Sequence, residues 1–191
     1  LILIAYLIIQ FAYCLKLKQK PLLDIFAVSS GFLLRASSGM VACDLSSSPW
    51  FLLSVGLLAL FLTIEKRKAE LIITSKTKKL TRSVLKRYSM PLLLRLESLV
   101  STSCFLTYSL WAFGPKFQGA KSQWMMLTIP FVLAGIFRYQ LISDPDEFAR
   151  KKRKNIDYSA ETPEEVLLQD NGIRLIILFW FITLIVIGFL V

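Results

Sequence analysis

Histidine is absent from this sequence of 191 residues, and cysteine occurs only three times. Without histidine, the chain has no histidine ligand for haem, chlorophyll or zinc, and no histidine proton relay. Cys14, Cys43 and Cys104 lie in or beside separate apolar runs without C-x-x-C spacing, which favours small packing residues over disulfide partners or metal ligands. Oxygen-ligated Mg²⁺ stays compatible with this composition.

Polar stretches long enough to form a soluble domain are almost absent as well. Hydrophobic residues make up 55% of the chain. Apolar runs occur at 1–13, 22–43, 50–64, 91–113, 124–143 and 173–191. Since about 20 apolar residues in a helix cross the hydrocarbon core, this pattern predicts an all-α, polytopic membrane helix bundle. We expect six transmembrane helices in a single domain that covers 1–191.

The first apolar run is short for a membrane span. It extends over about 13 residues, or about 20 Å of helix, before the polar segment LKLKQK begins. The chain also begins with Leu1 and not with methionine. We therefore expect this sequence to be the C-terminal part of a larger membrane protein.

Basic residues outnumber acidic ones, with 23 Lys and Arg against 13 Asp and Glu. Most of them lie in the connections 14–21, 65–90 and 144–172, whereas 44–49 has none and 114–123 has two. The positive-inside rule places the basic connections on the cytoplasmic or stromal side of a bacterial plasma or thylakoid membrane. Anionic lipids attract the same residues. We expect no nucleic-acid partner, because aromatic residues do not interleave with the basic ones on a soluble fold.

One ionisable residue lies in the middle of a predicted span. Arg35 falls near the centre of the run 22–43, where a charge costs a few kcal/mol or more unless water or a partner receives it. Asp24 and Arg35 share one stripe of that helix. A guanidinium matches phosphate geometry well, so we expect Arg35 to contact substrate. A structural ion pair with Glu97 is the alternative.

Other charged and aromatic residues gather at the predicted cytoplasmic ends of the spans. They are Tyr13, Lys18, Asp24, Lys66, Arg67, Glu70, Arg138 and Tyr139. Their convergence at one level predicts a shared polar site. Two alternatives stay open. In the first, charged residues within EKRKAEL form ordinary ion pairs at a helix end, each worth a few tenths of a kcal/mol. In the second, the Arg138 side chain only extends toward the membrane interface.

Several blocks of this sequence resemble one known family in the same order along the chain. They are AYCLKLKQKPLLDIFAVSSGFLLRASSG, SPWFLLSVGLLALFLTIEKRKAEL, RYSMPLLLRLES, LTIPFVLAGIFRYQLISDP and TPEEVLLQD. The family is the polyprenyl-phosphate phosphoribosyltransferases, the decaprenylphosphoryl-ribose-phosphate synthase branch of the UbiA prenyltransferase superfamily. The resemblance covers essentially the whole chain, which looks like the C-terminal two-thirds of a family member.

The resemblance implies a UbiA-type bundle of nine helices around a cavity that faces the cytoplasm, with six of the helices in this chain. It implies a transferase that moves phosphoribose from phosphoribosyl diphosphate to a polyprenyl phosphate, with Mg²⁺ holding the diphosphate. Substrate-binding roles carry over by motif to Tyr13, Lys18, Asp24, Arg35, Lys66, Arg67, Glu70, Arg138 and Tyr139. The family's aspartate-rich metal motif would lie upstream, so we expect no metal ligand in this chain and no activity from it alone.

The sequence also departs from the family, and other functions stay open. Where relatives often have LLxDRP, this chain has LLQDNG, with Asn171 and Gly172 in place of a basic residue and proline. The alternative functions are a scaffold subunit in a larger, for example photosynthetic, membrane complex and prenyl transfer to a quinone or chlorophyll precursor. EKRKAEL in place of a second aspartate-rich motif disfavours prenyl transfer. The last connection has two interpretations: a short amphipathic helix at 164–168 that covers the cavity mouth, and a solvated tether.

Overall fold

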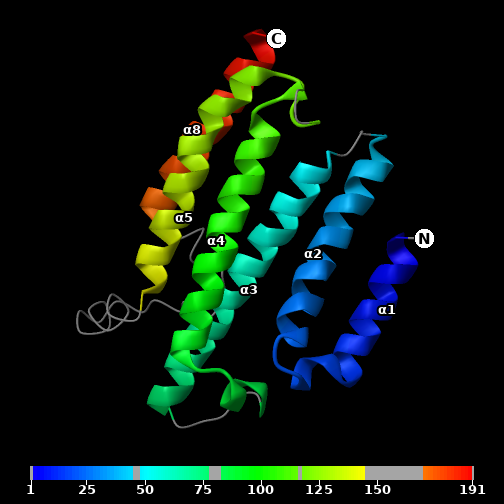
Figure 1. Cartoon of the computed structure of the whole chain (residues 1–191), viewed down its shortest axis with the longest axis vertical. Helices are drawn as coiled ribbons and strands as arrows, with labels where there is room; N and C mark the ends of the chain where they lie inside the picture. Colours follow the sequence, from blue (N-terminus) through cyan, green and yellow to red (C-terminus); the bar gives the residue numbers. More distant parts are fainter. Residues whose placement is uncertain (1, 45–47, 78–82, 116–117, 145–169, 191) are drawn as a thin grey trace. The chain divides into compact units, whose positions relative to one another are not determined.

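A computed structural model describes residues 2–44, 48–77, 83–115, 118–144 and 170–190. The described residues form helices and no strand, which confirms the all-α prediction (Figure 1). The α-helices in these ranges are α1 (Ile2–Leu15), α2 (Leu23–Ala42), α3 (Pro49–Thr77), α4 (Met90–Ala112), α5 (Ile129–Ser143) and α8 (Asn171–Leu190). The 3-10 helices in the same ranges are η1 (Leu17–Gln19), η2 (Ser83–Arg87) and η4 (Gln123–Thr128). The predicted helix at 164–168 lies outside the described residues.

Four of the predicted spans are long and apolar enough to cross a membrane. They are Leu23–Ala42, Pro49–Thr74, Gln123–Ser143 and Asn171–Phe189. The other two predicted spans form α1, a shorter apolar helix of 14 residues, and α4, of 23 residues. The chain is therefore an integral membrane protein, since segments of this length and composition are stable in hydrocarbon only as helices.

The third helix is longer than its apolar run. The sequence pattern predicted a span that ends at residue 64 and a connection over 65–90, but α3 continues through the charged segment to Thr77. That segment contains Lys, Arg, Glu, Ala and Leu, which all favour helix. Its charged side chains also find buried partners on other elements. Hydropathy alone therefore placed the end of the helix too early.

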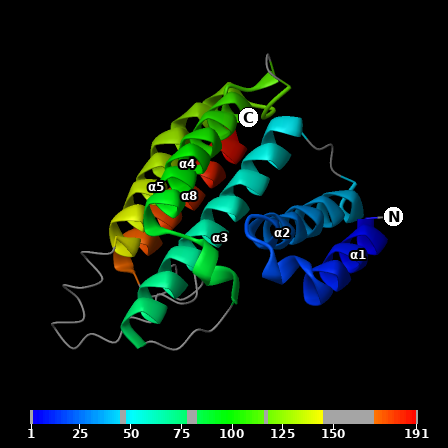
Figure 2. The same ribbon diagram turned by 60° about the horizontal axis from the view of Figure 1, so that its bottom comes forward.

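The chain divides into two compact units, Leu1–Tyr108 and Ser109–Val191. In the first unit, α2 packs against both α1 and α3, as two views show (Figure 1, Figure 2). Its buried apolar cluster joins Ile25, Ile64, Val84, Tyr88 and Leu93. This cluster connects α2, α3, the η2 segment and α4, so these elements hold one another near the polar side chains described below.

In the second unit, α5 packs along α8, and η4 packs against both helices. Large apolar side chains on α8, such as Leu178 and Phe181, are exposed, and on α1 of the first unit Leu3 and Leu7 are exposed too. Exposed apolar helix faces are expected where the surrounding solvent is lipid.

Candidate functional site

Four polar residues form a buried group where α2, α3 and the segment before α4 meet. This Asp24 group consists of Asp24, Arg67, Glu70 and Tyr88. Arg67 Nε lies 2.9 Å from Asp24 Oδ2, and Arg67 Nη1 donates a hydrogen bond of 2.6 Å to Glu70 Oε2. The Tyr88 hydroxyl donates to Asp24 Oδ1 at 2.6 Å. The Asp24 side chain is 0% exposed and the Arg67 side chain is 2% exposed. Other side chains, and not bulk water, are therefore the partners of these charges.

The backbone before α2 is unusual and helps to place Asp24. Leu22, the residue that caps α2, has φ 67° and ψ −45°, close to the strained conformation of a γ-turn. Its N–H donates a hydrogen bond of 2.7 Å to the Tyr88 hydroxyl. Asp24 follows in the first turn of α2, where the helix dipole favours a carboxylate. Burial, together with the hydrogen bond to Asp24, raises the pKa of Tyr88 above its ordinary value of 10.

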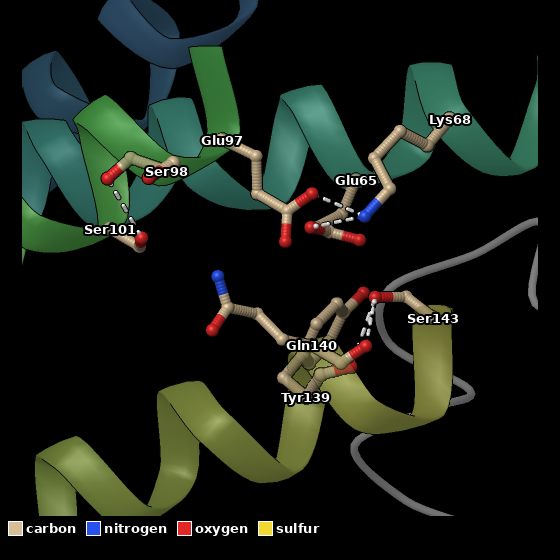
Figure 3. A network of polar contacts seen from close by, with 8 residues as sticks. All are labelled: Glu65, Lys68, Glu97, Ser98, Ser101, Tyr139, Gln140 and Ser143. Carbon is tan, nitrogen blue, oxygen red and sulfur yellow. Dashed lines mark hydrogen bonds and ion pairs between the residues drawn. The ribbon is translucent and has the colours of Figure 1, made fainter. Parts of the chain in front are cut away.

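A second buried group lies one residue further along α3. In this Lys68 group, Lys68 Nζ donates a 3.1 Å hydrogen bond to Glu65 Oε1 and another hydrogen bond to Glu97 on α4 (Figure 3). All three side chains are buried. Successive residues of a helix point roughly 100° apart, so Arg67 and Lys68 reach different neighbours from the same turn. One turn of α3 thereby joins α2 through Arg67 and α4 through Lys68.

The two groups place four carboxylates around two cations. Buried ion pairs of this kind contribute little net stability, but removal of one partner is costly because the other charge stays buried. The arrangement therefore holds each charge at a defined position. Fixed charges of this kind can stabilise charge that develops in a transition state, because they need no reorganisation during the reaction.

The described residues do not fit a magnesium site. Among them, no group of three His, Cys, Asp or Glu side chains is placed to hold a metal ion. The carboxylates of Asp24 and Glu70 bind Arg67, and those of Glu65 and Glu97 bind Lys68. We therefore derive no chemical step through a metal ion.

The second unit contains another pair of an arginine and an aspartate. Arg138 on α5 donates two hydrogen bonds of 3.0 Å to Asp170, from Nε to Oδ1 and from Nη2 to Oδ2. Asp170 precedes α8, and its Oδ1 also accepts a 2.8 Å hydrogen bond from the N–H of Ile173. Asp170 thus caps α8 and binds Arg138 at the same time. The Arg138 side chain is 39% exposed.

Gly172 explains how the guanidinium of Arg138 approaches the first turn of α8. A Cβ atom at this position would lie 2.7 Å from Arg138 Nε and 3.0 Å from Asp170 Oδ1. Both distances are too short for van der Waals contact, so any larger residue would displace one of the two side chains. In LLQDNG, where relatives often have LLxDRP, the glycine thus leaves room for the bidentate hydrogen bonds between Arg138 and Asp170.

The remaining predicted site residues of the first unit lie apart from the Asp24 group or at its border. Tyr13 on α1 is close enough to Arg67 for an electrostatic interaction. Lys66 is half-buried, and Lys18 is exposed in η1. Tyr139 on α5 is buried, and its backbone carbonyl accepts a 3.0 Å hydrogen bond from Ser143 (Figure 3).

Among the described residues, Arg35 forms no ion pair with a buried carboxylate. Its guanidinium lies 4.6 Å from the centre of the Phe32 ring and 5.7 Å from that of Tyr6, and its Nε donates a 3.2 Å hydrogen bond to the Gly31 carbonyl. The side chain is exposed. Glu97, the carboxylate considered as its partner, binds Lys68 instead. Cation–π contacts and a backbone carbonyl thus hold Arg35 on the surface of α2.

Five residues of these groups were missing from the predicted site: Glu65, Lys68, Tyr88, Glu97 and Asp170. Lys68 carries the same charge as the two residues before it in EKRKAEL, and its partner Glu97 is 29 positions away. Tyr88 lies 64 positions from Asp24, in a stretch predicted as a connection. Asp170 carried a usable signal, because an aspartate just before an apolar run is typical of a helix cap.

Comparison with known proteins identifies relatives over nearly the whole chain. No family model matches the sequence. A decaprenyl-phosphate phosphoribosyltransferase from Mycolicibacterium smegmatis is 34% identical over 188 residues, which cover 94% of this chain and 55% of the relative. The enzyme of that name from Mycobacterium tuberculosis is 34% identical over 184 residues, 96% of this chain and 56% of the relative. The one from Corynebacterium glutamicum is 31% identical over 177 residues, 92% and 49% respectively.

These similarities confirm the resemblance to this branch of the UbiA superfamily that the sequence blocks indicated. The chain spans about half the length of the curated relatives that it matches. None of the three names supports a scaffold subunit or prenyl transfer to a quinone or chlorophyll precursor.

Proposed function

We propose that this chain, homologous over more than nine tenths of its length to decaprenyl-phosphate phosphoribosyltransferases, is part of a membrane transferase that moves phosphoribose from phosphoribosyl diphosphate to a polyprenyl phosphate. The observation that carries the proposal is the convergence of Asp24, Arg67 and Glu70. These residues were assigned from motifs in separate blocks, and they form one buried group in the first unit.

Exposure divides the proposed site into two classes of residue. Asp24 and Arg67 are buried, so their role is to place charge and to hold α2 against α3. Glu70 has a side chain that is 14% exposed, and Lys66 is half-buried, so both can reach an incoming ligand. Lys18 is exposed in η1. We assign Lys18 and Lys66 to the phosphate oxygens of the donor and Glu70 to its ribose hydroxyls.

The proposed reaction is a substitution at the anomeric carbon of the ribose. A phosphate oxygen of the polyprenyl phosphate forms a bond to that carbon, while the bond to the diphosphate oxygen breaks and its electron pair leaves with diphosphate. Positive charge develops on the ribose and negative charge on the leaving group. Carboxylates near the sugar and cations near the diphosphate therefore lower the barrier without any proton transfer from the protein.

We propose the same sidedness that the loop charges indicated. The basic connections would face the cytoplasm, the polyprenyl phosphate would enter from the bilayer, and the water-soluble donor would enter from the basic side. A requirement for Mg²⁺ is part of the proposal, and no described residue is assigned to hold the ion. A surrounding membrane-protein complex has no support among the relatives and is not needed for this proposal.

Reconstitution of the complete gene product tests the function. The protein is placed in nanodiscs with decaprenyl phosphate, and phosphoribosyl diphosphate is added with and without Mg²⁺. We expect a phosphoribosylated lipid, detected by mass spectrometry, with diphosphate released in equal amount. Absence of that product with polyprenyl phosphates of any length, or a prenylated quinone precursor from a prenyl diphosphate, would contradict the proposal.

A matched pair of variants tests the assignment of residues. Lys66→Met removes a charge at the proposed site, and Lys121→Met removes an exposed charge from a different connection. A hydrogen bond to a charged group contributes about 1.5–3 kcal/mol, so Lys66→Met should lower kcat/KM for phosphoribosyl diphosphate by about 10- to 100-fold. Lys121→Met should stay within about twofold of wild type. Equal effects of the two substitutions would remove Lys66 from the site.

A further inference from the structure

Tyr88 joins elements that are far apart in the sequence. Its ring belongs to the apolar cluster that includes Ile25, Ile64 and Leu93, and the residue is buried. Its hydroxyl accepts a 2.7 Å hydrogen bond from the N–H of Leu22 and donates one of 2.6 Å to Asp24 Oδ1. Packing therefore fixes the ring, and the two hydrogen bonds fix the oxygen.

The carboxylate of Asp24 has a different partner for each oxygen. Oδ1 accepts from Tyr88, and Oδ2 lies 2.9 Å from Arg67 Nε. Two partners on different elements fix the plane of the carboxylate as well as its position. If the Tyr88 hydroxyl were lost, only Arg67 would hold Asp24, and the carboxylate would be free to rotate about its side-chain bonds.

The same hydroxyl supports the strained start of α2. Leu22 has a positive φ, which a leucine adopts only when surrounding interactions compensate for the strain. Its N–H is one of the groups at a helix start that have no partner within the helix, and Tyr88 supplies the acceptor. Tyr88 thus links the connection after α3 to both the backbone and the carboxylate at the start of α2.

We infer that Tyr88 is a positioning residue of the proposed transferase site, and that it acts by orienting Asp24 and, through Asp24, the guanidinium of Arg67. The inference rests on the proposed function, and it adds a residue that no motif assigned. Oriented charges stabilise the transition state, in which charge develops, more than they stabilise the bound substrates. Loss of the hydroxyl should therefore lower kcat more than it changes KM for either substrate.

Kinetics of the complete protein in nanodiscs test the inference. Tyr88→Phe removes only the hydroxyl and keeps the packed ring, and Tyr108→Phe makes the same change at a buried tyrosine within α4. We expect Tyr88→Phe to lower kcat about tenfold with KM for phosphoribosyl diphosphate within about twofold. Tyr108→Phe should change neither value by more than about twofold.

A double-mutant cycle distinguishes positioning from general destabilisation. If Tyr88 acts through Asp24, Tyr88→Phe should reduce kcat about tenfold in the wild-type background and less than twofold in Asp24→Asn. Equal reductions in both backgrounds would overturn the inference, because the hydroxyl would then act independently of that carboxylate. The melting temperature of each variant is measured in the same nanodiscs, and a kcat loss that follows the melting temperature across all variants would also overturn it.

The outcomes separate this inference from the proposed function. A wild-type protein that forms no phosphoribosylated lipid overturns the proposed function, and the inference with it. An active wild-type protein in which Tyr88→Phe and Tyr108→Phe behave alike overturns the inference alone. Selective loss of kcat in Tyr88→Phe, with coupling to Asp24, supports both.

Discussion

Two pairs of the same residue types, one in each unit, differ mainly in their burial. The side chains of Arg67 and Asp24 are 2% and 0% exposed, whereas those of Arg138 and Asp170 are 39% and 8% exposed. The Arg138 pair has the better geometry, with two parallel hydrogen bonds of 3.0 Å. Arg67 instead divides its contacts between Asp24 and Glu70.

Burial, more than hydrogen-bond geometry, determines how strongly each of these ion pairs depends on its neighbours. At Arg138, water solvates part of the guanidinium, and the N–H of Ile173 also donates to Asp170, so loss of the pair costs less. At Arg67, no water replaces a missing partner, and the protein must supply all of the compensation. Tyr88 and Glu70 provide that compensation for Asp24 and Arg67, and the buried pair therefore depends on its neighbours.

Removal of each arginine gives the largest expected difference between the two pairs. Arg67→Met leaves Asp24 and Glu70 buried without their cation and should lower the free energy of unfolding by about 3–5 kcal/mol. Arg138→Met, the matched control, should lower it by only about 1 kcal/mol, because water solvates part of the guanidinium and the N–H of Ile173 still donates to the buried Asp170. Denaturant unfolding in detergent micelles, followed by tryptophan fluorescence, measures both values. Similar losses for the two variants would show that burial does not distinguish the pairs.

A substitution at Gly172 tests the geometry of the Arg138 pair without changing its charges. Gly172→Ala places a Cβ atom 2.7 Å from Arg138 Nε, so the guanidinium must move and its two-fold hydrogen bond is disturbed. Gly188→Ala is the control in the same helix, since its Cβ would have no neighbour within 4 Å. The control should gain about 0.5–1 kcal/mol of stability from helix propensity, whereas Gly172→Ala should lose about 1 kcal/mol relative to it. Equal thermal stabilities of the two variants would show that the approach at Gly172 is not restrictive.

The strained residue beside the buried pair permits a smaller test. Leu22→Gly should stabilise the protein by up to about 1 kcal/mol, because glycine tolerates positive φ and the leucine side chain is 44% exposed. Leu23→Gly is the control, since Leu23 is 43% exposed but lies within α2. The control should lose about 1 kcal/mol from helix propensity. The melting temperatures of both variants, measured in nanodiscs, should change in opposite directions, and a fall in both would contradict the assignment of strain to Leu22.

The smallest expected effect concerns the pH dependence of stability that arises from ionisation of Tyr88. Burial and the hydrogen bond to Asp24 raise the pKa of Tyr88, so the folded state favours the neutral phenol. Its contribution to stability should be fully present below about pH 10 and should be lost as pH rises through the raised folded-state pKa. The difference in melting temperature between wild type and Tyr88→Phe should therefore stay constant up to about pH 10. A phenolate absorbance that appears below pH 10 in the wild type and is missing in Tyr88→Phe would contradict the raised pKa of Tyr88.

The boundaries of most helices could be predicted from apolar runs, with differences of a few residues. The run 22–43 corresponds to Leu23–Ala42, and the run 91–113 corresponds to Met90–Ala112. A membrane helix must satisfy its backbone internally and present apolar side chains over its length, so hydropathy carries this information directly. The same reasoning failed at the end of α3, where charged side chains continue the helix because partners on α2 and α4 receive them.

The candidate site could be predicted only in part. Motifs in separate blocks pointed to Asp24, Arg67 and Glu70, which the structure brings together. Their roles in substrate binding stay a prediction, as do those of Lys18, Arg35 and Lys66. Tyr88 escaped prediction because a tyrosine beside a helix start is ordinary, and only its position next to Asp24 makes it notable.

The amino-acid sequence by itself determined that this chain enters a membrane as helices, because the transfer of apolar side chains from water depends on composition and run length. It also determined which residue types are available for binding phosphate. The tertiary structure alone decided which distant charges meet: Arg67 binds Asp24, Lys68 binds Glu97, and Arg138 binds Asp170. Electrostatic attraction acts through distance in space, and several of these partners are tens of residues apart along the chain, so local sequence patterns cannot specify them.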